Sequence, residues 1–524
     1  MKIIFDGKEL EASEGTTILG IARQQGIEIP TLCFLENCTP LSTSCLVCLV
    51  KADGKMVPAC ATVAVDGMAV ESETDEVRQL RKASLELLLS DHYGDCYATC
   101  QIACPAKLDI PRMLRQIRDG NADAAVETVK ETIPLPAVLG RVCPKPCEKV
   151  CRRKEIDSPV AICAMKRHVG DADLASCPNG SCPNGSRFSP KTGVSFGETD
   201  LPSASFGETG LPKQRVVVIG AGPSGLSAAF YLTRLGHRVE LYGQKRQPGG
   251  RLRTLSEDVL PLSVLDAEIR TILSLPIDYY PEEHIDWTQP GALDDMLNSF
   301  AAVLLCTGPC DAESLERSGL ELRDGRLVIG HGTFSTSKPG VFATGTLIRS
   351  AAAMIVRSVA DGREAAESID RFLWNGKPIP AVPTFAVKLG KLTREEIDLL
   401  ADVSQDEPAT DSDVARESAR CLHCDCRGRE KCQLLKHAAT YRAETNRFAE
   451  GSRRPLEIRR SGDIVFEPGK CIKCGLCIAV SRDAAPGLAF HGRGFNVRIG
   501  VPFDEPLEHR EAARICPTAA LSLE

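Results

Sequence analysis

The sequence predicts a multidomain α+β and α/β protein in which cysteine-rich units flank one Rossmann-like unit. The chain has 524 residues and 24 cysteines, and most of these cysteines recur at short spacings. One glycine fingerprint, Gly220-Ala221-Gly222-Pro223-Ser224-Gly225, lies between the cysteine-rich parts. Thiolates at such spacings hold iron–sulfur clusters, and a glycine loop between a strand and a helix holds a dinucleotide. The sequence therefore indicates a redox protein.

Composition limits the partners and the compartment. A net charge of −7 and a pI near 5.9 argue against nucleic acid or an anionic membrane as the main partner. No apolar run approaches the roughly 20 residues of a membrane span, and Asp6 interrupts the apolar start that a signal peptide needs. We expect a cytoplasmic protein, in which thiols are metal ligands or core residues rather than disulfides.

Residues 1–75 are predicted to form a [2Fe-2S] domain. Strand-like alternation at residues 2–5, 47–50 and 68–70 surrounds four candidate ligands: Cys33, Cys45, Cys48 and Cys60. Three thiolates from one loop and a fourth from a neighbouring strand can enclose a two-iron cluster. The motifs around these cysteines resemble the N-terminal [2Fe-2S] domain of the large iron–sulfur subunit of complex I and of related hydrogenase subunits, which implies a β-grasp ferredoxin fold. Cys38 is surplus to this set.

Residues 76–170 are predicted to be helical. Apolar residues recur at helical spacing from Glu76 to Ser90, and a second helical stretch runs from Pro111 to Val129. Eight candidate cluster ligands lie here: His92, Cys96, Cys100, Cys104, Cys143, Cys147, Cys151 and Cys163.

The motifs Cys104-Pro105, Gly140–Pro144 and Pro146–Glu148 resemble the small subunit of glutamate synthase. In that family an N-terminal helical domain binds two [4Fe-4S] clusters through interleaved ligands. The resemblance implies one set of His92, Cys96, Cys100 and Cys151, and another of Cys104, Cys143, Cys147 and Cys163. His92 completes the first set because a histidine shortly before a cysteine also ligates a cluster in the complex I subunit; the alternative is a surface histidine.

Residues 171–213 are predicted to be a linker. Ser-Cys-Pro-Asn-Gly and Ser-Phe-Gly-Glu-Thr each occur twice in this segment, and stretches so rich in Gly, Pro and Ser cannot build a core. Cys177 and Cys182 within it are interpreted as incidental.

Residues 214–380 are predicted to form a Rossmann-like FAD-binding domain. A strand at Arg215–Gly220, a helix at Pro223–Leu235 and a strand at Arg238–Tyr242 give the glycine loop its required context. The segments 247–251, 302–308 and 340–345 resemble flavin-domain motifs of the glutamate synthase family, which implies FAD. The candidate cofactor-binding residues are Gly220, Gly222, Pro223, Ser224, Gly225, Gly249, Gly250, Arg251, Gly345 and Thr346.

Three features of this domain depart from that family. An acidic residue that holds the adenosine ribose is replaced near Gly243, and Thr346 stands where an Asp is usual. Each loss removes a hydrogen bond of about 1–2 kcal/mol, and an empty, vestigial fold is the alternative. Residues 309–340 are too few for the second nucleotide-binding domain of the family, so the chain itself is not expected to bind NAD(P)H.

Residues 381–420 are predicted to be a linker and a helix, and residues 421–524 a C-terminal iron–sulfur domain. Cys421, Cys424, Cys426 and Cys432 fall within one short segment, which suits one [4Fe-4S] cluster or, alternatively, tetrahedral zinc. Cys471, Cys474, Cys477 and the distant Cys516 before a proline suit a cubane. This second set resembles a ferredoxin-like cluster site of the complex I and hydrogenase subunits.

These features together predict an electron-transfer iron–sulfur flavoprotein subunit of a multi-subunit anaerobic oxidoreductase. Its expected cofactors are FAD, [2Fe-2S] and [4Fe-4S] clusters, and no catalytic side chain is predicted. The resemblance implies as partner an NADH-oxidising flavoprotein, a formate dehydrogenase or hydrogenase catalytic subunit, or ferredoxin. The alternatives are a stand-alone ferredoxin-dependent FAD reductase of a small substrate and an assembly protein with degenerate sites.

Overall fold

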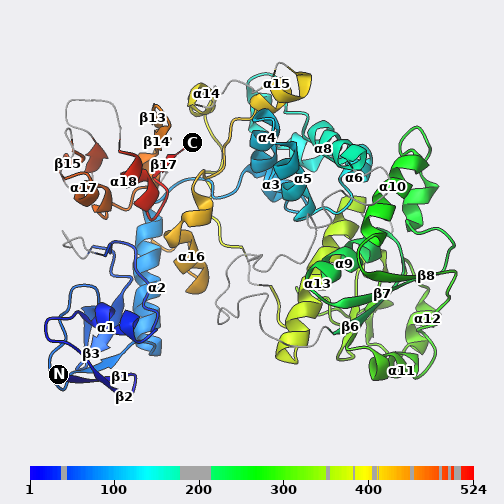
Figure 1. The fold of residues 1–524 in the computed structure, drawn as a ribbon, viewed down its shortest axis with the longest axis horizontal. Helices are drawn as coiled ribbons and strands as arrows, with labels where there is room; N and C mark the ends of the chain where they lie inside the picture. The colour runs from blue at the N-terminus through cyan, green and yellow to red at the C-terminus, as the bar shows by residue number, and fades with distance from the viewer. Residues whose placement is uncertain are drawn as a thin grey trace.

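The computed structural model describes residues 1–36, 44–176, 214–349, 354–381, 384–403, 410, 412–448, 454–482, 487–493, 497–500 and 509–523. Cys38, Cys177, Cys182 and, apart from Ser176, the duplicated pentapeptides lie outside these ranges. Helices, a mixed sheet and a parallel sheet occur together, which confirms the predicted α+β and α/β architecture (Figure 1). Within the same ranges, no helix has the length and apolar character needed to cross a bilayer.

The N-terminal unit is a five-stranded mixed sheet in the order β2-β1-β5-β3-β4. Ile3 and Phe5 alternate inward along the first strand and are fully buried beneath the helix α1, whose N-terminus is capped by Thr17. The elements are β1 (Lys2–Phe5), β2 (Lys8–Glu11), α1 (Ile18–Gln24), β3 (Leu49–Ala52), β4 (Lys55–Pro58) and β5 (Ala69–Glu71).

A helical region follows. The predicted stretch from Pro111 to Val129 divides into two helices, because Gly120 takes a φ of 71° and Asn121 caps the second helix. The helices are α2 (Asp75–Ser90), α3 (Thr99–Ala103), α4 (Ile110–Arg118), α5 (Ala122–Lys130), α6 (Pro136–Val142), α7 (Pro146–Lys149), η1 (Arg152–Glu155) and α8 (Ile162–Ser176). The last helix extends into the segment that the sequence predicts as linker.

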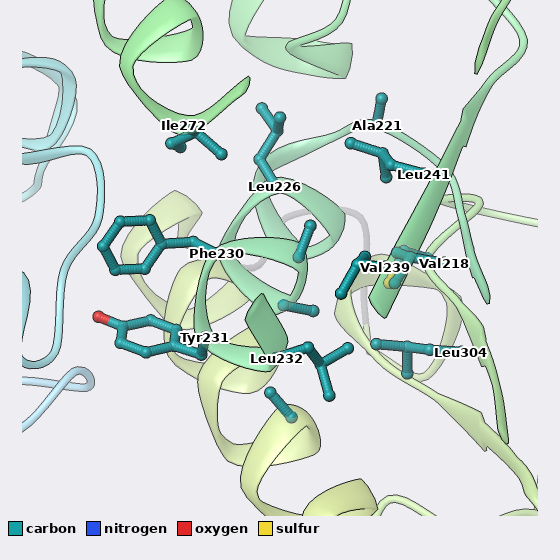
Figure 2. Packing of buried hydrophobic residues seen from close by; sticks show 14 of the residues in the cluster. Val218, Ala221, Leu226, Phe230, Tyr231, Leu232, Val239, Leu241, Ile272 and Leu304 are labelled. Atoms are coloured by element: carbon teal, nitrogen blue, oxygen red, sulfur yellow. The ribbon is translucent and has the colours of Figure 1, made fainter. Parts of the chain in front are cut away.

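The Rossmann-like unit is a parallel sheet in the order β12-β9-β6-β7-β8. In Figure 2, Val218, Val239 and Leu304 of the sheet face α9, whose residues Leu226 and Leu232 are fully buried against them. Its elements are β6 (Arg215–Ile219), α9 (Pro223–Arg234), β7 (Arg238–Gly243), η2 (Gly250–Thr254), α10 (Leu262–Leu273), β8 (Ile277–Pro281), α11 (Ala292–Ser299), β9 (Ala302–Leu305), α12 (Ala312–Arg317), β10 (Leu322–Arg323), β11 (Arg326–Leu327), β12 (Val341–Ala343), η3 (Gly345–Leu347) and α13 (Ile355–Asn375).

The helical region packs directly on the Rossmann-like unit. Glu268 of α10 is buried, and its two carboxylate oxygens accept hydrogen bonds from the backbone N–H groups of Ala137 and Val138 at 2.6 and 2.8 Å. These N–H groups belong to the first turn of α6, where carboxylates are favoured. Buried hydrogen bonds therefore join the two regions.

The segment after α13 returns to the N-terminal part of the chain. Its helix α16 lies beside α2 in Figure 1 although the two are more than 300 residues apart in sequence. Buried Arg81 of α2 donates to the Tyr441 hydroxyl at 2.9 Å, and Glu86 accepts from the backbone N–H of Glu444 at 3.0 Å. The elements are α14 (Arg394–Val403), α15 (Asp413–Ala419), η4 (Arg429–Lys431) and α16 (Gln433–Thr440).

The C-terminal unit contains a three-stranded antiparallel sheet in the order β13-β14-β17 and a hairpin of β15 and β16. Its core is built from apolar residues of the sheet, the hairpin and the last helix, including Ile464, Leu521, Ile499 and Ala512. The elements are β13 (Arg459–Ser461), β14 (Ile464–Phe466), η5 (Pro468–Lys470), α17 (Leu476–Val480), β15 (Ala489–His491), β16 (Arg498–Gly500), α18 (Arg510–Ile515) and β17 (Leu521–Leu523).

Candidate cofactor sites

The first group of thiols, here called the N-terminal thiol site, consists of Cys33, Cys45, Cys48 and Cys60, all buried. The Cys33 and Cys45 sulfurs are 3.3 Å apart. Hydrogen bonds from the Cys45 and Cys60 thiols lower the pKa of Cys33 below its ordinary value, and a hydrogen bond from the Cys60 thiol lowers the pKa of Cys48. The structure thus brings together the four residues that the sequence groups.

The helical thiol site consists of Cys104, Cys143, Cys147 and Cys163. The Cys163 thiol hydrogen-bonds to those of Cys143 and Cys147. The buried Lys166 ammonium lies 3.9 Å from the Cys163 sulfur; although burial opposes it, the four thiols hold the pKa of Lys166 above its ordinary value. These four cysteines are the second set that the sequence predicts.

The first split site consists of Cys100, Cys151, Cys421 and Cys424, which line one hollow together with apolar side chains such as Ile110 and Leu114. Burial raises the pKa of Cys100, and the neighbouring Cys424, Cys421 and Cys151 raise it further. Two residues thus come from the helical region, and the other two come from a segment about 270 residues later.

The second split site consists of Cys96, Cys426 and Cys432. Burial raises the pKa of Cys432 to about 12, with added contributions from Cys426 and Cys96. Backbone N–H groups reach two of these sulfurs: Val387 donates to Cys96 at 3.3 Å and Leu435 to Cys432 at 3.4 Å.

His92 precedes Cys96 by four residues and is only 8% exposed, which contradicts the alternative of a surface histidine. Its Nδ1 is 3.1 Å from the carbonyl oxygen of Lys470. A carbonyl can only accept, so Nδ1 carries the proton and Nε2 keeps a free lone pair. Burial lowers the pKa of His92 to about 4, so the ring is neutral at pH 7. A neutral imidazole with this tautomer is suited to bind a metal.

The two split sites correct the predicted grouping. The sequence placed Cys421 and Cys424 with Cys426 and Cys432 in one site, and Cys96 with Cys100 in another; both groupings are wrong. Asp425, which separates Cys424 from Cys426, is buried and bound by Arg115 of α4 at 3.4 Å. This ion pair holds the segment between the two split sites. Cys421 and Cys424, before Asp425, therefore lie in the first split site, and Cys426 and Cys432, after it, lie in the second.

The C-terminal thiol site consists of Cys471, Cys474, Cys477 and Cys516, which line a hollow together with Leu476 and Ile499. The loop can wrap around this hollow because Lys473 and Gly475 take positive φ values of 56° and 78°. Backbone N–H groups of Lys473 and Leu521 donate to the Cys471 and Cys516 sulfurs at 3.4 and 3.5 Å.

These donor sets fit polynuclear clusters. Each site offers three or four sulfurs in mostly apolar surroundings, and N–H groups directed at sulfur are a usual feature of cluster sites. Across the described ranges, no three His, Cys, Asp or Glu side chains approach closely enough to hold a single metal ion. A tetrahedral zinc site made of Cys421, Cys424, Cys426 and Cys432 is therefore contradicted, since these residues lie in two separate sites.

The five sites form a row. Cys474 of the C-terminal thiol site interacts electrostatically with Cys33, and Cys516 of the same site with Cys432. The two split sites are joined through the single residue Asp425. Cys100 and Cys104 lie one helical turn apart, which joins the first split site to the helical thiol site. The resulting order is N-terminal, C-terminal, second split, first split and helical.

The dinucleotide motifs converge at the N-terminus of α9. Gly249 donates to the Ala221 carbonyl at 2.7 Å, and a Cβ on Gly345 would lie 2.5 Å from the Ser224 hydroxyl. A Cβ on Gly225 would lie 1.8 Å from the carbonyl oxygen of Gly220, so only glycine fits there. Gly222 is the N-cap residue of α9 and provides no side-chain cap. A Cβ built on Gly222 would have no neighbouring atom within 4 Å. The first N–H groups of α9 are thus available to a diphosphate. Pro223 lies in the glycine loop, Gly250 and Arg251 follow Gly249, and Thr346 follows Gly345.

Tyr279 of β8 occupies the place of one missing acidic residue. A Cβ on Gly243 would lie 2.8 Å from the Tyr279 hydroxyl, and this hydroxyl is buried without a hydrogen-bond partner among the described residues. An unpartnered buried hydroxyl at the ribose end of the site fits a bound dinucleotide. The sequence analysis missed Tyr279, because only the sheet register of β7 against β8 brings it beside the glycine motif.

Three families match separate parts of the chain. The 2Fe-2S iron-sulfur cluster binding domain matches residues 1–75, the dihydropyrimidine dehydrogenase domain II with its 4Fe-4S cluster matches residues 89–177, and the NAD(P)-binding Rossmann-like domain matches residues 218–282. These matches confirm the iron–sulfur and Rossmann-like units that the sequence predicts.

Curated relatives match over parts of their length. NADP(+)-dependent formate dehydrogenase subunit beta of Moorella thermoacetica is 33% identical over 221 residues, 40% of this chain and 29% of that subunit. NAD-dependent dihydropyrimidine dehydrogenase subunit PreT of Escherichia coli (strain K12) is 31% identical over 249 residues, 46% of this chain and 52% of that subunit. A subunit of the NADH-quinone oxidoreductase of Rhizobium meliloti is 43% identical over 98 residues, 18% of this chain and 11% of that subunit. The chain thus spans about half or less of these relatives, all of which are oxidoreductase subunits by name.

Proposed function

We propose that this protein is the electron-transfer subunit of a multi-subunit oxidoreductase and that electrons pass along its row of thiol sites to or from the dinucleotide at α9. The row itself is the observation that supports this function most strongly. Its helical end reaches the Rossmann-like unit, since Arg357 of α13 donates to the carbonyl of Pro105, next to Cys104, at 3.5 Å. Gly362 of the same helix packs against the Ser224 carbonyl of the glycine loop.

The proposed ligands follow the five sites. The N-terminal thiol site would hold a [2Fe-2S] cluster, and each of the other four sites a [4Fe-4S] cluster, with His92 as the fourth ligand at the second split site. Sulfur ligands balance the ferric charge, while the N–H groups directed at sulfur and the apolar walls of each hollow tune the reduction potential.

The proposed dinucleotide is FAD, held by the residues at the N-terminus of α9. When bound, FAD exchanges one or two electrons, which would connect single-electron clusters to two-electron chemistry. The resemblance of the glycine motifs to the glutamate synthase small-subunit family supports this identity. The open N-cap at Gly222 and the buried Tyr279 hydroxyl would bind the diphosphate and the ribose.

We assign nicotinamide oxidation to a partner rather than to this chain. The segment between β9 and β12 contains only α12 and the β10–β11 hairpin within the described residues. Candidate partners are an NADH-oxidising flavoprotein or a formate dehydrogenase or hydrogenase catalytic subunit. The names of the Moorella and Rhizobium relatives support partners of this kind.

Anaerobic purification followed by optical reduction tests this function. The chain should contain about 18 iron atoms, from one two-iron and four four-iron clusters, and one FAD. Its visible absorbance should resist NADH and NADPH and bleach with dithionite. Rapid bleaching by either nicotinamide would contradict the assignment of nicotinamide oxidation to a partner, and iron near zero would contradict the relay.

The variant Gly222→Ala tests the dinucleotide site separately. Its methyl group meets no protein atom within 4 Å and would occupy the path of the diphosphate. We expect FAD to be lost while the iron content and the thermal stability stay as in the wild type. Retention of stoichiometric FAD in this variant would exclude the N-terminus of α9 as its binding site.

A further inference from the structure

Lys166 of α8 is a buried cation in an unusual setting. Lys166 is only 4% exposed, and its ammonium lies 3.9 Å from the sulfur of Cys163. The charges that act on it come from the thiols of the helical thiol site. In the part of the chain that the structure describes, no carboxylate forms an ion pair with Lys166.

Buried cations near the two split sites are neutralised by carboxylates. Arg152, which hydrogen-bonds to Cys424, pairs with buried Asp95 at 2.5 Å. Lys470, which interacts with Cys426, pairs with buried Glu467 at 2.5 Å. At those sites the positive and negative charges of the protein largely cancel. The largest charge effects on Lys166 instead come from the sulfurs of the helical thiol site.

A buried, unpaired ammonium is strongly unfavourable unless negative charge lies beside it. A [4Fe-4S] cluster with four thiolates supplies that charge, and its negative charge grows by one when it accepts an electron. Because the surroundings are buried, the attraction between the ammonium and the added charge is screened little. The reduced cluster therefore gains more from Lys166 than the oxidised cluster does.

We propose that Lys166 is a positioning charge that raises the reduction potential of the cluster at the helical thiol site. This inference rests on the proposed function, because it requires a cluster on Cys104, Cys143, Cys147 and Cys163. Reduction adds one electron to the cluster, and Lys166 keeps its proton throughout. The effect makes the cluster nearest the dinucleotide site a better electron acceptor than its ligands alone would make it.

The test is an EPR-monitored redox titration of the full-length, anaerobically reconstituted protein and of three variants. Lys166→Met and Lys166→Gln remove the charge, and Lys149→Met is the matched control. Lys149 follows Cys147 by two residues but is exposed, so water screens its charge. Iron content and EPR signal intensity are measured on every sample, which reports cluster occupancy independently of activity.

We expect Lys166→Met and Lys166→Gln to lower the midpoint potential of one [4Fe-4S] signal by at least 59 mV, a tenfold change in the ratio of reduced to oxidised cluster at a fixed potential. The other signals, the iron content and all signals of Lys149→Met should not change. An unshifted potential with full iron content would overturn the inference. Loss of about four irons in both Lys166 variants would also overturn it, because Lys166 would then be needed for assembly rather than for the potential. A wild-type protein lacking this cluster would overturn the ligand assignment itself.

Discussion

The N-terminal thiol site and the two split sites are built in opposite ways. All four residues of the N-terminal thiol site lie between Cys33 and Cys60, inside one five-stranded sheet unit. The split sites combine residues 96–151 with residues 421–432, and the whole Rossmann-like unit lies between them in sequence. A cluster in the first kind of site depends on one local unit. A cluster in the second kind requires that most of the chain has already folded.

Because of this difference, clusters at the two kinds of site would stabilise the folded protein in different ways. Cluster binding at a site assembled by folding contributes its binding free energy to the folded state. At the N-terminal thiol site that free energy would stabilise one unit. At the split sites it would fasten the segment around Asp425 to the helical region, as a cross-link does.

The largest expected effect separates the two kinds of site directly. Cys424→Ser removes a proposed ligand of the first split site, and Cys48→Ser removes a proposed ligand of the N-terminal thiol site. We expect Cys424→Ser to lose about four irons and to loosen residues 412–432 from α4, whereas Cys48→Ser should lose about two irons and change nothing elsewhere. Iron analysis and hydrogen exchange of the two variants measure both effects.

The opposite outcome for Cys424→Ser is also informative. If hydrogen exchange in residues 412–432 equalled that of the wild type after four irons were lost, then protein contacts alone would hold this segment. The proposed role of the cluster as a cross-link would then be wrong, although the ligand assignment would stand.

Protein contacts at the junction between the segment around Asp425 and the helical region give the next largest effect. Arg429 of η4 donates to Asp109 at 2.5 Å and lies 4.6 Å from the ring centre of Tyr97. Arg429→Met would leave the mostly buried Asp109 carboxylate unpaired, and we expect a loss of about 3 kcal/mol in the free energy of unfolding. Lys51→Met, which breaks the partly exposed Lys51–Glu76 pair between β3 and α2, should have a much smaller effect, because an exposed ion pair contributes little to stability. Denaturant titration followed by cluster absorbance compares the two. Equal costs would mean that the junction is not the more tightly bonded region.

A smaller effect concerns the contact between α2 and the segment after α16. Glu86 is fully buried and accepts hydrogen bonds from the Glu444 N–H at 3.0 Å and from Arg447 at 2.7 Å. Burial opposes its charge, but these partners hold the pKa of Glu86 below its ordinary value. Glu86→Gln should therefore cost about 2 kcal/mol at pH 7.

The pH dependence of this difference has a defined sign. Because the folded-state pKa of Glu86 is depressed, its contribution is fully present above the unfolded-state pKa and is lost as the pH falls through the folded-state value. The stabilities of wild type and Glu86→Gln should thus converge in acid. A difference that stays constant from pH 7 to below pH 4 would show that the effect arises from packing rather than from charge.

The same contrast, between sites built from nearby cysteines and sites built from distant ones, explains which sites the sequence could predict. The N-terminal, helical and C-terminal thiol sites contain the residues that their spacings and family resemblances group, because each is built within one folded unit. The split sites were predicted wrongly, because the tertiary anchor at Asp425 separates cysteines that are neighbours in sequence. Lys166 was not predicted for a similar reason: a lysine on a helix has no sequence signal that tells a buried charge from a solvated one.

The dinucleotide site repeats this contrast on a smaller scale, since a local glycine loop is completed by Tyr279 from a separate strand. Removing the Tyr279 hydroxyl with Tyr279→Phe should cost about 1 kcal/mol of FAD binding, or about a fivefold weaker Kd. Tyr280→Phe is the control, because Tyr280 is 39% exposed and stacks on Tyr242. Fluorescence titration of the FAD-depleted protein measures both affinities. An unchanged Kd for Tyr279→Phe would mean that the hydroxyl does not reach the ribose, and that the glycine loop and the N-terminus of α9 hold the dinucleotide without a substitute for the missing acidic residue.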